Sequence, residues 1–161
     1  MKNETEADRA IEKYADTVRR VCFMHLKNYS DAEDVFQEVF MKFILRDKPF
    51  ESDDHERAWL IRVAINASKD VLKSFFRRNA RSLEDIDTEP FYIQEEDKGV
   101  LDAVLDLPGN YKDVIYLFYY EGYSAVEIAK ILGKRENTIY TWLSRARAKL
   151  KDALGGDLFD G

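Results

Sequence analysis

Polar side chains of the kind that contact DNA recur on one side of the segment from residue 136 to residue 151. They are Tyr140, Thr141, Ser144, Arg145 and Arg147. Arginine binds phosphates or the edge of guanine, and hydroxyl groups bind phosphates or bases. The other side of the segment carries apolar residues at i, i+4, i+7 and i+11, namely Ile139, Leu143, Ala146 and Leu150. This spacing predicts a helix with one buried face and one face suited to nucleic acid.

The residues before this helix have the spacing of a helix-turn-helix. Ala129, Gly133 and Ile139 fall at i, i+4 and i+10. Two helices that cross at a tight turn need a small residue, a residue that tolerates positive φ and an apolar anchor at such positions. The second helix is expected to begin near residues 136 and 137. A helical hairpin that only packs is the alternative, but it does not account for the basic residues beyond the turn.

The net charge of −6 hides a strong segregation of charge along the chain. Residues 57–81 hold seven basic side chains against Asp70, and residues 82–106 hold nine acidic side chains against Lys98. Residues 133–151 hold six basic side chains against Glu136. Two basic segments separated by an acidic one indicate two contacts with a polyanion. The stretch from 79 to 98 lacks a helical period and contains Pro90, so we expect a linker there.

The first basic segment is predicted to form a helix from about residue 55 to about residue 78. Its apolar stripe is Leu60, Ala64, Ala67 and Val71. The opposite side carries Arg62, Asn66, Lys69 and Lys73. A row of this kind can be a solvated helix face. Because Arg77, Arg78 and Arg81 continue its charge, we interpret it as a track for nucleic acid.

Two more helices are predicted nearer the N-terminus. The first spans residues 7–27, and Ser30 and Glu33 form a predicted capping box that opens the second. The second helix is expected to bury Ala32, Val35, Phe36, Val39, Phe40 and Phe43. Its opposite face carries Asp34, Gln37, Glu38 and Met41. From the pattern alone, solvation is the simpler explanation of such a face.

No arrangement typical of an enzyme, a metal site or a cofactor site is visible in the sequence. His25 and His55 lack the Glu-x-x-His spacing of a di-metal bundle, and both are expected at the surface or its boundary. No nucleophile–base set or phosphate-binding glycine loop is visible either. Cys22 is the single cysteine and is expected to be a buried thiol. With no apolar run of about 18 residues and no signal peptide, we expect a cytoplasmic protein without membrane insertion.

The order of these parts resembles bacterial sigma factors of the extracytoplasmic-function (ECF) type over nearly the whole chain. The segments DAEDVFQEVF at 31–40 and WLIRVAIN at 59–66 are similar to sigma region 2. The segments LPGNY at 107–111, EGYSAVEIA at 121–129 and TIYTWLSRAR at 138–147 are similar to sigma region 4. Both regions in this order, joined by an acidic linker, are very specific to the family.

The resemblance implies an all-α promoter-specificity factor built from two small helical domains. Region 2 would span residues 1–78 and the region 4 helix-turn-helix residues 99–161, with the acidic linker at 79–98. The implied partners are core RNA polymerase, double-stranded promoter DNA and the unpaired −10 strand, and an anti-sigma protein is left open as a further partner. The residues implied for polymerase docking are Asp34, Gln37, Glu38 and Met41. Those implied for the −10 element are Arg62, Asn66, Lys69 and Lys73. Those expected at the −35 element are Arg135, Asn137, Thr138, Tyr140, Thr141, Ser144 and Arg145.

Four positions depart from the usual pattern of the family. Lys134 stands where the turn normally has an aliphatic residue, and Tyr140 and Trp142 stand where basic residues are frequent. Asn137 replaces the common glycine, which is tolerable because asparagine also adopts left-handed conformations. With fewer charges on the second helix, −35 binding is expected to be weak by itself and to rely on tethering through polymerase. The alternative hypothesis is a stand-alone helix-turn-helix regulator that acts without polymerase. That hypothesis leaves the polar 34–41 face and the separate basic helix unexplained.

Overall fold

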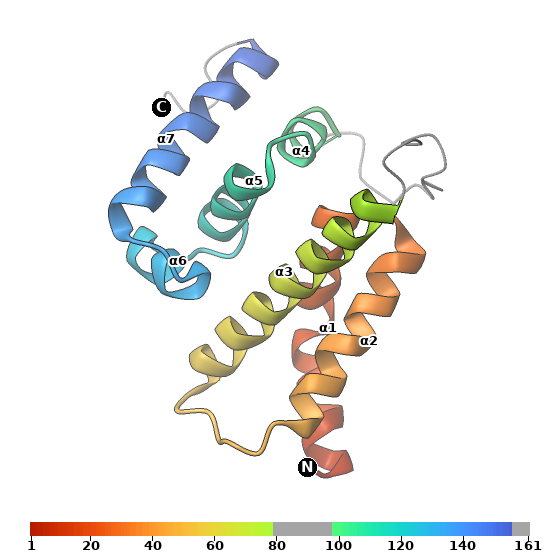
Figure 1. Ribbon diagram of the computed structural model, residues 1–161. Coiled ribbons are helices and arrows are strands. Elements are labelled where there is room, and N and C mark those ends of the chain that lie inside the picture. The colour runs from red at the N-terminus through yellow and green to blue at the C-terminus, as the bar shows by residue number, and fades with distance from the viewer. Residues whose placement is uncertain (79–97, 156–161) are drawn as a thin grey trace. The chain divides into compact units, whose positions relative to one another are not determined.

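The protein folds into helices that form two compact units. The computed structural model describes residues 1–78 and 98–155, and the units comprise residues 1–91 and 92–161. The first unit contains α1 (Glu4–Leu26), α2 (Tyr29–Leu45) and α3 (Asp53–Arg78) (Figure 1). The second contains α4 (Lys98–Leu105), α5 (Gly109–Ile115), η2 (Tyr116–Tyr120), α6 (Ala125–Leu132) and α7 (Glu136–Leu154). The described ranges contain no strand, so the all-α prediction is confirmed.

The predicted linker at 79–98 lies outside the described residues, except for Lys98, which is the first residue of α4. Among the helices of the described ranges, none is long and apolar enough to cross a membrane.

In the first unit, α1, α2 and α3 pack against one another through the predicted apolar faces. All six apolar residues predicted for α2 are buried. On α3, Leu60, Ala64 and Ala67 are buried, whereas Val71 is partly exposed. The rings of Phe36, Phe40 and Phe43 form a row along α2, with successive centroids 4.9 and 6.3 Å apart. Because this aromatic row faces the core, the rotation of α2 is fixed and the opposite face must lie in solvent.

The start of α2 differs from the prediction. The N-cap is Asn28, whose side chain accepts a hydrogen bond from the amide of Asp31 at 3.0 Å, and Ser30 lies inside the first turn. Glu33 does not close a capping box, because its carboxylate binds Arg19 Nε at 2.7 Å. The preceding residue, Lys27, ends α1 in the left-handed conformation. Only Lys27 and Asn28 separate the two helices, so the cap has to come from Asn28.

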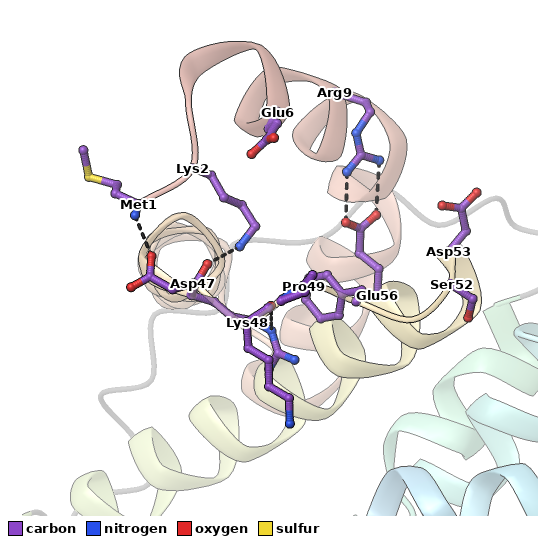
Figure 2. A pocket seen from close by; sticks show the side chains of 12 residues that line it. Met1, Lys2, Glu6, Arg9, Asp47, Lys48, Pro49, Ser52, Asp53 and Glu56 are labelled. Atoms are coloured by element: carbon purple, nitrogen blue, oxygen red, sulfur yellow. Dashed lines mark hydrogen bonds and ion pairs between the residues drawn. The ribbon is translucent and has the colours of Figure 1, made fainter.

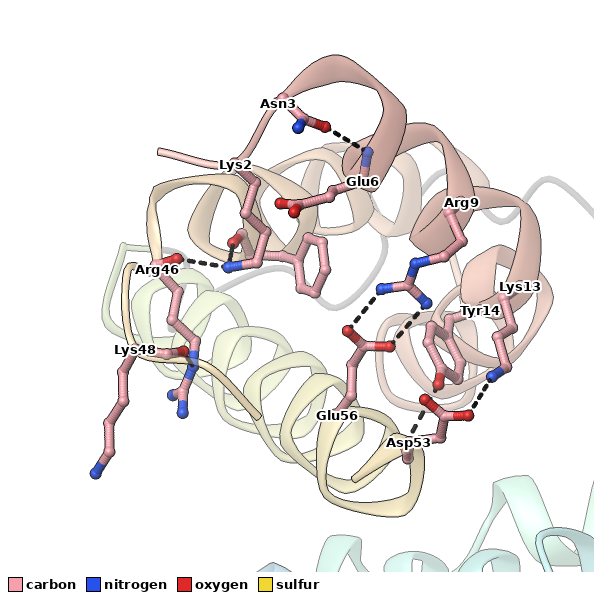
Figure 3. A network of polar contacts seen from close by, with 11 residues as sticks. Lys2, Asn3, Glu6, Arg9, Lys13, Tyr14, Arg46, Lys48, Asp53 and Glu56 are labelled. Atoms are coloured by element: carbon pink, nitrogen blue, oxygen red, sulfur yellow. Dashed lines mark hydrogen bonds and ion pairs between the residues drawn. The ribbon is translucent and has the colours of Figure 1, made fainter. Parts of the chain in front are cut away.

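A polar network holds α1, the 46–52 connection and α3 together at one end of the first unit (Figure 3). Lys2 Nζ donates to the carbonyls of Phe43 and Arg46 at 2.8 and 2.5 Å, which satisfies groups at the C-terminal end of α2. Burial lowers the pKa of Lys2, and the Arg46 charge lowers it further. Arg9 forms a two-pronged ion pair with the buried carboxylate of Glu56 at 3.1 and 2.9 Å. These contacts join the first helix to the start of the third.

The same contacts line a hollow of about 480 Å³ (Figure 2). Phe50 lies on its wall, 6.0 Å from Phe43 and 5.6 Å from Trp59 between ring centroids. The guanidinium of Arg46 lies 4.3 Å from the Phe50 ring. The lining mixes cations with acids such as Glu6 and Asp53, so much of its charge is already compensated. We therefore regard the hollow as part of the support that holds the 46–52 connection in place.

The second unit contains the predicted helix-turn-helix in α6 and α7. Ser124 and Glu127 form a capping box at the start of α6, and these hydrogen bonds lower the pKa of Glu127. Gly133 ends α6 with φ +66°, and the amide of Lys134 donates to Ala129 at 2.9 Å. The predicted buried stripe of α7, namely Ile139, Leu143, Ala146 and Leu150, is confirmed. The turn and the start of α7 at residue 136 also match the prediction.

The helical segment between Pro108 and Gly122 is divided into two parts. The α5 helix runs from residue 109 to residue 115, and the π-helical turn η2 follows. The amide of Glu121 therefore donates to Tyr116, five residues back, at 3.2 Å. Gly122 has φ +74°, a left-handed conformation that is common for the glycine that follows the end of a helix. The wider turn adds one residue to the winding and shifts where the following side chains point.

Candidate polymerase and nucleic-acid interfaces

The polar face of α2 is exposed along two turns of the helix. Asp34, Gln37, Glu38 and Met41 are all exposed, and Met41 is 56% exposed. Within the described residues, the only ion pair made by any of these four side chains joins Glu38 to Lys42 at 3.2 Å. Both side chains of this pair are half-exposed and lie on neighbouring turns of the helix. Such pairs contribute little to stability. The face is thus acidic at its N-terminal end, apolar at Met41, and not needed to hold the helix in place.

Three of the four residues predicted for the α3 track are exposed. Arg62, Asn66 and Lys73 lie in solvent, and none forms a side-chain hydrogen bond or ion pair with the residues that the structure describes. Lys69 is only partly exposed and does have an interaction. Because Leu60 and Ala64 are buried on the other side, the track faces away from the core of its unit. The geometry suits a long contact with a polyanion, with Lys69 the least available member.

The seven residues predicted for the −35 element lie at the N-terminal half of α7 and just before it. Arg135, Asn137, Tyr140, Thr141, Ser144 and Arg145 are exposed, and Thr138 is partly exposed. Within the described ranges, none of the seven has a side-chain hydrogen bond or an ion pair. Asn137 is part of α7 and does not adopt a left-handed backbone conformation. The surface is therefore free to contact bases, and Trp142, which is partly buried, belongs in part to the core.

Arg147 does not belong with the other polar residues of α7. Its Nε donates to the hydroxyl oxygen of Tyr119 at 2.7 Å. The guanidinium also lies 5.4 Å from the ring centroid of Phe118 and 5.6 Å from that of Tyr119. These contacts tie α7 to η2 within the second unit. Sequence spacing grouped Arg147 with Arg145, but the structure gives the two arginines different roles.

Cys22 and His25, to which the sequence gives no functional role, lie in the core of the first unit. Cys22 is fully buried as predicted, and burial raises the pKa of its thiol to about 11. His25 is also buried, 5% exposed, so its predicted surface location is wrong. His55 is partly exposed and accepts a hydrogen bond from the amide of Glu51. In the part of the chain that the structure describes, no group of three or more His, Cys, Asp or Glu residues could hold a metal ion.

One feature of the helix-turn-helix was missed in the sequence. The angle between α6 and α7 contains a hollow of about 470 Å³, which we call the elbow hollow. Its cationic lining is Lys130, Lys134 and Arg135, and its apolar lining is Val126 and Ala129. The spacing of Lys130 and Lys134, four residues apart on either side of Gly133, was the available signal.

Comparison with known proteins agrees with this arrangement. The sigma-70 region 2 model matches residues 10–82, and the sigma-70 region 4 model matches residues 98–150. The ECF RNA polymerase sigma factor SigW of Bacillus subtilis (strain 168) is 30% identical over 161 residues, which cover 89% of this chain and 86% of SigW.

Two solved structures share the fold. The sigma factor RpoE of Bartonella quintana, solved in complex with the anti-sigma factor NepR, matches with a TM-score of 0.78 and 22% identity over 93% of this chain and 97% of that chain. CnrH, solved in complex with the cytosolic domain of CnrY, matches with a TM-score of 0.67 and 25% identity over 96% and 91% of the two chains. With both region models matched in order and SigW similar along most of its length, the chain belongs to the ECF family of RNA polymerase sigma factors, which bind core polymerase and give it promoter specificity.

Proposed function

We propose that this sigma factor divides its task among three exposed helix faces. The 34–41 face of α2 docks on core RNA polymerase, the α3 track reads the −10 element, and the N-terminal half of α7 reads the −35 element. The observation that carries the proposal is shared by all three helices. Each buries its predicted apolar face, apart from the partly exposed Val71 of α3, so the polar residues opposite are presented in fixed rows.

The α2 face is the part that separates a sigma factor from a stand-alone regulator. A DNA-binding protein that acts alone has no use for an acidic and apolar stripe on a different helix from its basic surfaces. Asp34 and Glu38 supply negative charge, and the exposed Met41 supplies a flexible apolar contact. A helical partner with basic and apolar side chains fits this combination.

The α3 track offers two kinds of contact. Asn66 has a donor and an acceptor on a short side chain, which suits the edge of an unpaired base. Arg62 and Lys73, on either side of it along the helix, suit phosphates. The proposal therefore assigns sequence reading at −10 to Asn66 and placement of the strand to the cations.

On α7, the first turns enter the major groove and the helix-turn-helix is held at the promoter by polymerase. Arg145 contacts a phosphate or forms a two-pronged hydrogen bond with guanine, and Tyr140 adds an apolar contact or a hydrogen bond. The acidic linker is proposed to run near the path of the nascent RNA, where its charge suits a basic channel. An anti-sigma protein is proposed as a further partner, and the bacterial cytoplasm, where polymerase and promoter meet, as the location.

Charge reversal on α2 tests the docking proposal. Asp34→Arg/Glu38→Arg should weaken binding to core polymerase at least tenfold, because it places two cations opposite a basic partner. The matched control is Asp8→Arg/Glu12→Arg, which changes the charge equally on exposed positions of α1. Both proteins should keep the helicity and melting temperature of the wild type. Wild-type affinity of the α2 variant in fluorescence anisotropy with core polymerase, or an equal loss in both variants, would show that α2 is not the docking face.

A further inference from the structure

Phe76, near the C-terminal end of α3, is an exposed aromatic residue in the cationic row of that helix. Its side chain is 55% exposed. The α3 track occupies positions 62, 66, 69 and 73, so residue 76 is the next position of the same row. Lys73 and Arg77, which flank the ring, are both exposed and form no hydrogen bond or ion pair with a described residue. The row therefore continues with a phenyl ring between two cations.

The neighbouring phenylalanine has a different role. Phe75 is partly buried and lies four residues after Val71, so it continues the apolar stripe of α3. The two rings meet edge to face, with centroids 6.0 Å apart and planes at 77°. This contact restrains the Phe76 ring and so lowers the entropy that binding has to remove. One exposed apolar side chain is ordinary on a protein surface, but a restrained ring inside a cationic row is the arrangement of a stacking site.

The charge and the ring together select the class of ligand. Within residues 68–78 the lysines and arginines outnumber the single acid, Asp70, so this end of the helix attracts a polyanion. A phenyl ring has no hydrogen-bonding group and adds nothing to a contact with phosphate alone. It binds the flat face of a base, which is accessible where a strand is unpaired. Single-stranded nucleic acid supplies both the phosphates and the open base face.

We propose that Phe76 stacks on an unpaired base of the promoter strand that the α3 track holds, with Lys73 and Arg77 on the adjoining phosphates. This inference rests on the proposed −10 role of α3. Phe76 lies ten residues beyond Asn66, about 15 Å along the helix axis at 1.5 Å per residue. At about 3.4 Å per nucleotide of a stacked strand, the stacked base lies about four steps from the base that Asn66 reads. The ring holds the strand open there, whatever the identity of the base.

The test measures formation of the open complex by the holoenzyme on a promoter fragment selected by the wild-type holoenzyme. Phe76→Ala should weaken it about 5- to 50-fold. Phe76→Trp should restore it because indole also stacks, whereas Phe76→Leu should not, because leucine is apolar but has no ring. None of these changes alters charge, so the slope of log affinity against log salt should keep its wild-type value, in contrast to Lys73→Ala.

Tyr29→Ala is the matched control. Tyr29 is 51% exposed and lies in the same unit, but at the start of α2, where Asp31 is the charged residue of the first turn. This variant should form the open complex as the wild type does. Abasic sites, placed one at a time in the −10 strand, then locate the stacked base. One position should weaken binding of the wild type and have no further effect on Phe76→Ala.

Four results would overturn the stacking proposal. Equal rescue by leucine and tryptophan would show an apolar contact in place of a stack. Weaker binding of Phe76→Ala to core polymerase without DNA would place the ring against polymerase, and a lower melting temperature with unchanged promoter binding would place it in the fold. If every abasic position affects the wild type and Phe76→Ala equally, the stack is absent, and the −10 role of α3 stands if Asn66→Ala still changes base preference. If neither Asn66→Ala nor Phe76→Ala alters promoter binding, the −10 role fails and the inference fails with it.

Discussion

Alanine replacements at Arg145 and Arg147 should have opposite consequences, although the two residues are two positions apart and carry the same charge. Arg145 is exposed and has no partner in the described structure, so its removal should cost the fold almost nothing. Its loss should appear in promoter binding. Arg147 is held by Tyr119 and lies over two rings, so its removal should appear in stability.

The contacts of the two arginines determine how large the expected changes in stability and binding are. A hydrogen bond from a charged donor contributes about 1.5–3 kcal/mol when buried and less at a partly exposed site, and a partly exposed cation–π contact adds about 0.5 kcal/mol. We therefore expect Arg147→Ala to lower the stability of the second unit by about 1–2 kcal/mol, or roughly 5–15 °C in melting temperature for a domain of this size. Arg145→Ala should weaken holoenzyme binding by about 1–3 kcal/mol, roughly 5- to 150-fold, if it contacts a base.

The assays are thermal unfolding of the full chain, followed by circular dichroism, and holoenzyme footprinting over the −35 element. Arg145→Ala should melt with the wild type and lose −35 protection. Arg147→Ala should melt earlier and, below its melting range, keep the wild-type sequence preference. Equal melting temperatures for the two variants would refute the structural role of Arg147, and an unchanged −35 footprint in Arg145→Ala would remove that residue from the base-reading set.

Three further predictions follow from other parts of the chain. Asn66→Ala should change base preference at one −10 position, whereas Lys73→Ala should weaken binding evenly and lower the salt slope by about one unit, and equal sequence-independent losses would show that Asn66 reads no base. Hydrogen bonds from Ser124 hold the pKa of Glu127 below its usual range, so this carboxylate stabilises the folded state above about pH 4.3 and the benefit is lost as pH falls through the lower, folded-state pKa. Glu127→Gln should be less stable than the wild type by about 0.5 kcal/mol at neutral pH, and in thermal melts the difference should shrink as the pH falls below about 4.3, whereas a difference that does not change with pH would contradict the charge argument. Cys22, with a pKa of about 11 and no exposed surface, should react with iodoacetamide at pH 8 only on unfolding, and fast labelling of the native protein would contradict its burial.

The sequence predicted which face of each helix is buried better than it predicted where each helix begins and ends. Apolar spacing is set by helical geometry, so the buried faces of α2 and α7 could be found from residues such as Phe43 and Leu143 alone. The N-cap residue of α2 could not be identified from the sequence, because Asn28 and Ser30 are both suitable N-cap residues and each has an acidic residue three positions later. The choice depends on how closely α1 and α2 follow each other, which is a tertiary constraint.

Contacts between side chains of different helices could not be predicted from the sequence either. Arg147 shares the spacing of a DNA-facing residue, but the π-helical turn at η2 presents Tyr119 to it. No spacing rule identifies that turn in advance. The network of Lys2, Arg9 and Glu56 joins positions more than 40 residues apart, so it too depends on the packed unit. The candidate faces could be predicted because each lies on the side of its helix opposite the apolar stripe, and burial of that stripe leaves the opposite side exposed.

Run-off transcription with purified core polymerase on a library of genomic promoter fragments tests the central claim most directly. The account predicts that transcripts start only when this protein is added, and that their promoters share one motif near −10 and another near −35. The Asp34→Arg/Glu38→Arg protein should give few transcripts from the same library. Specific DNA binding by the protein alone, with no transcription gained from core polymerase, would contradict the account and identify a stand-alone regulator.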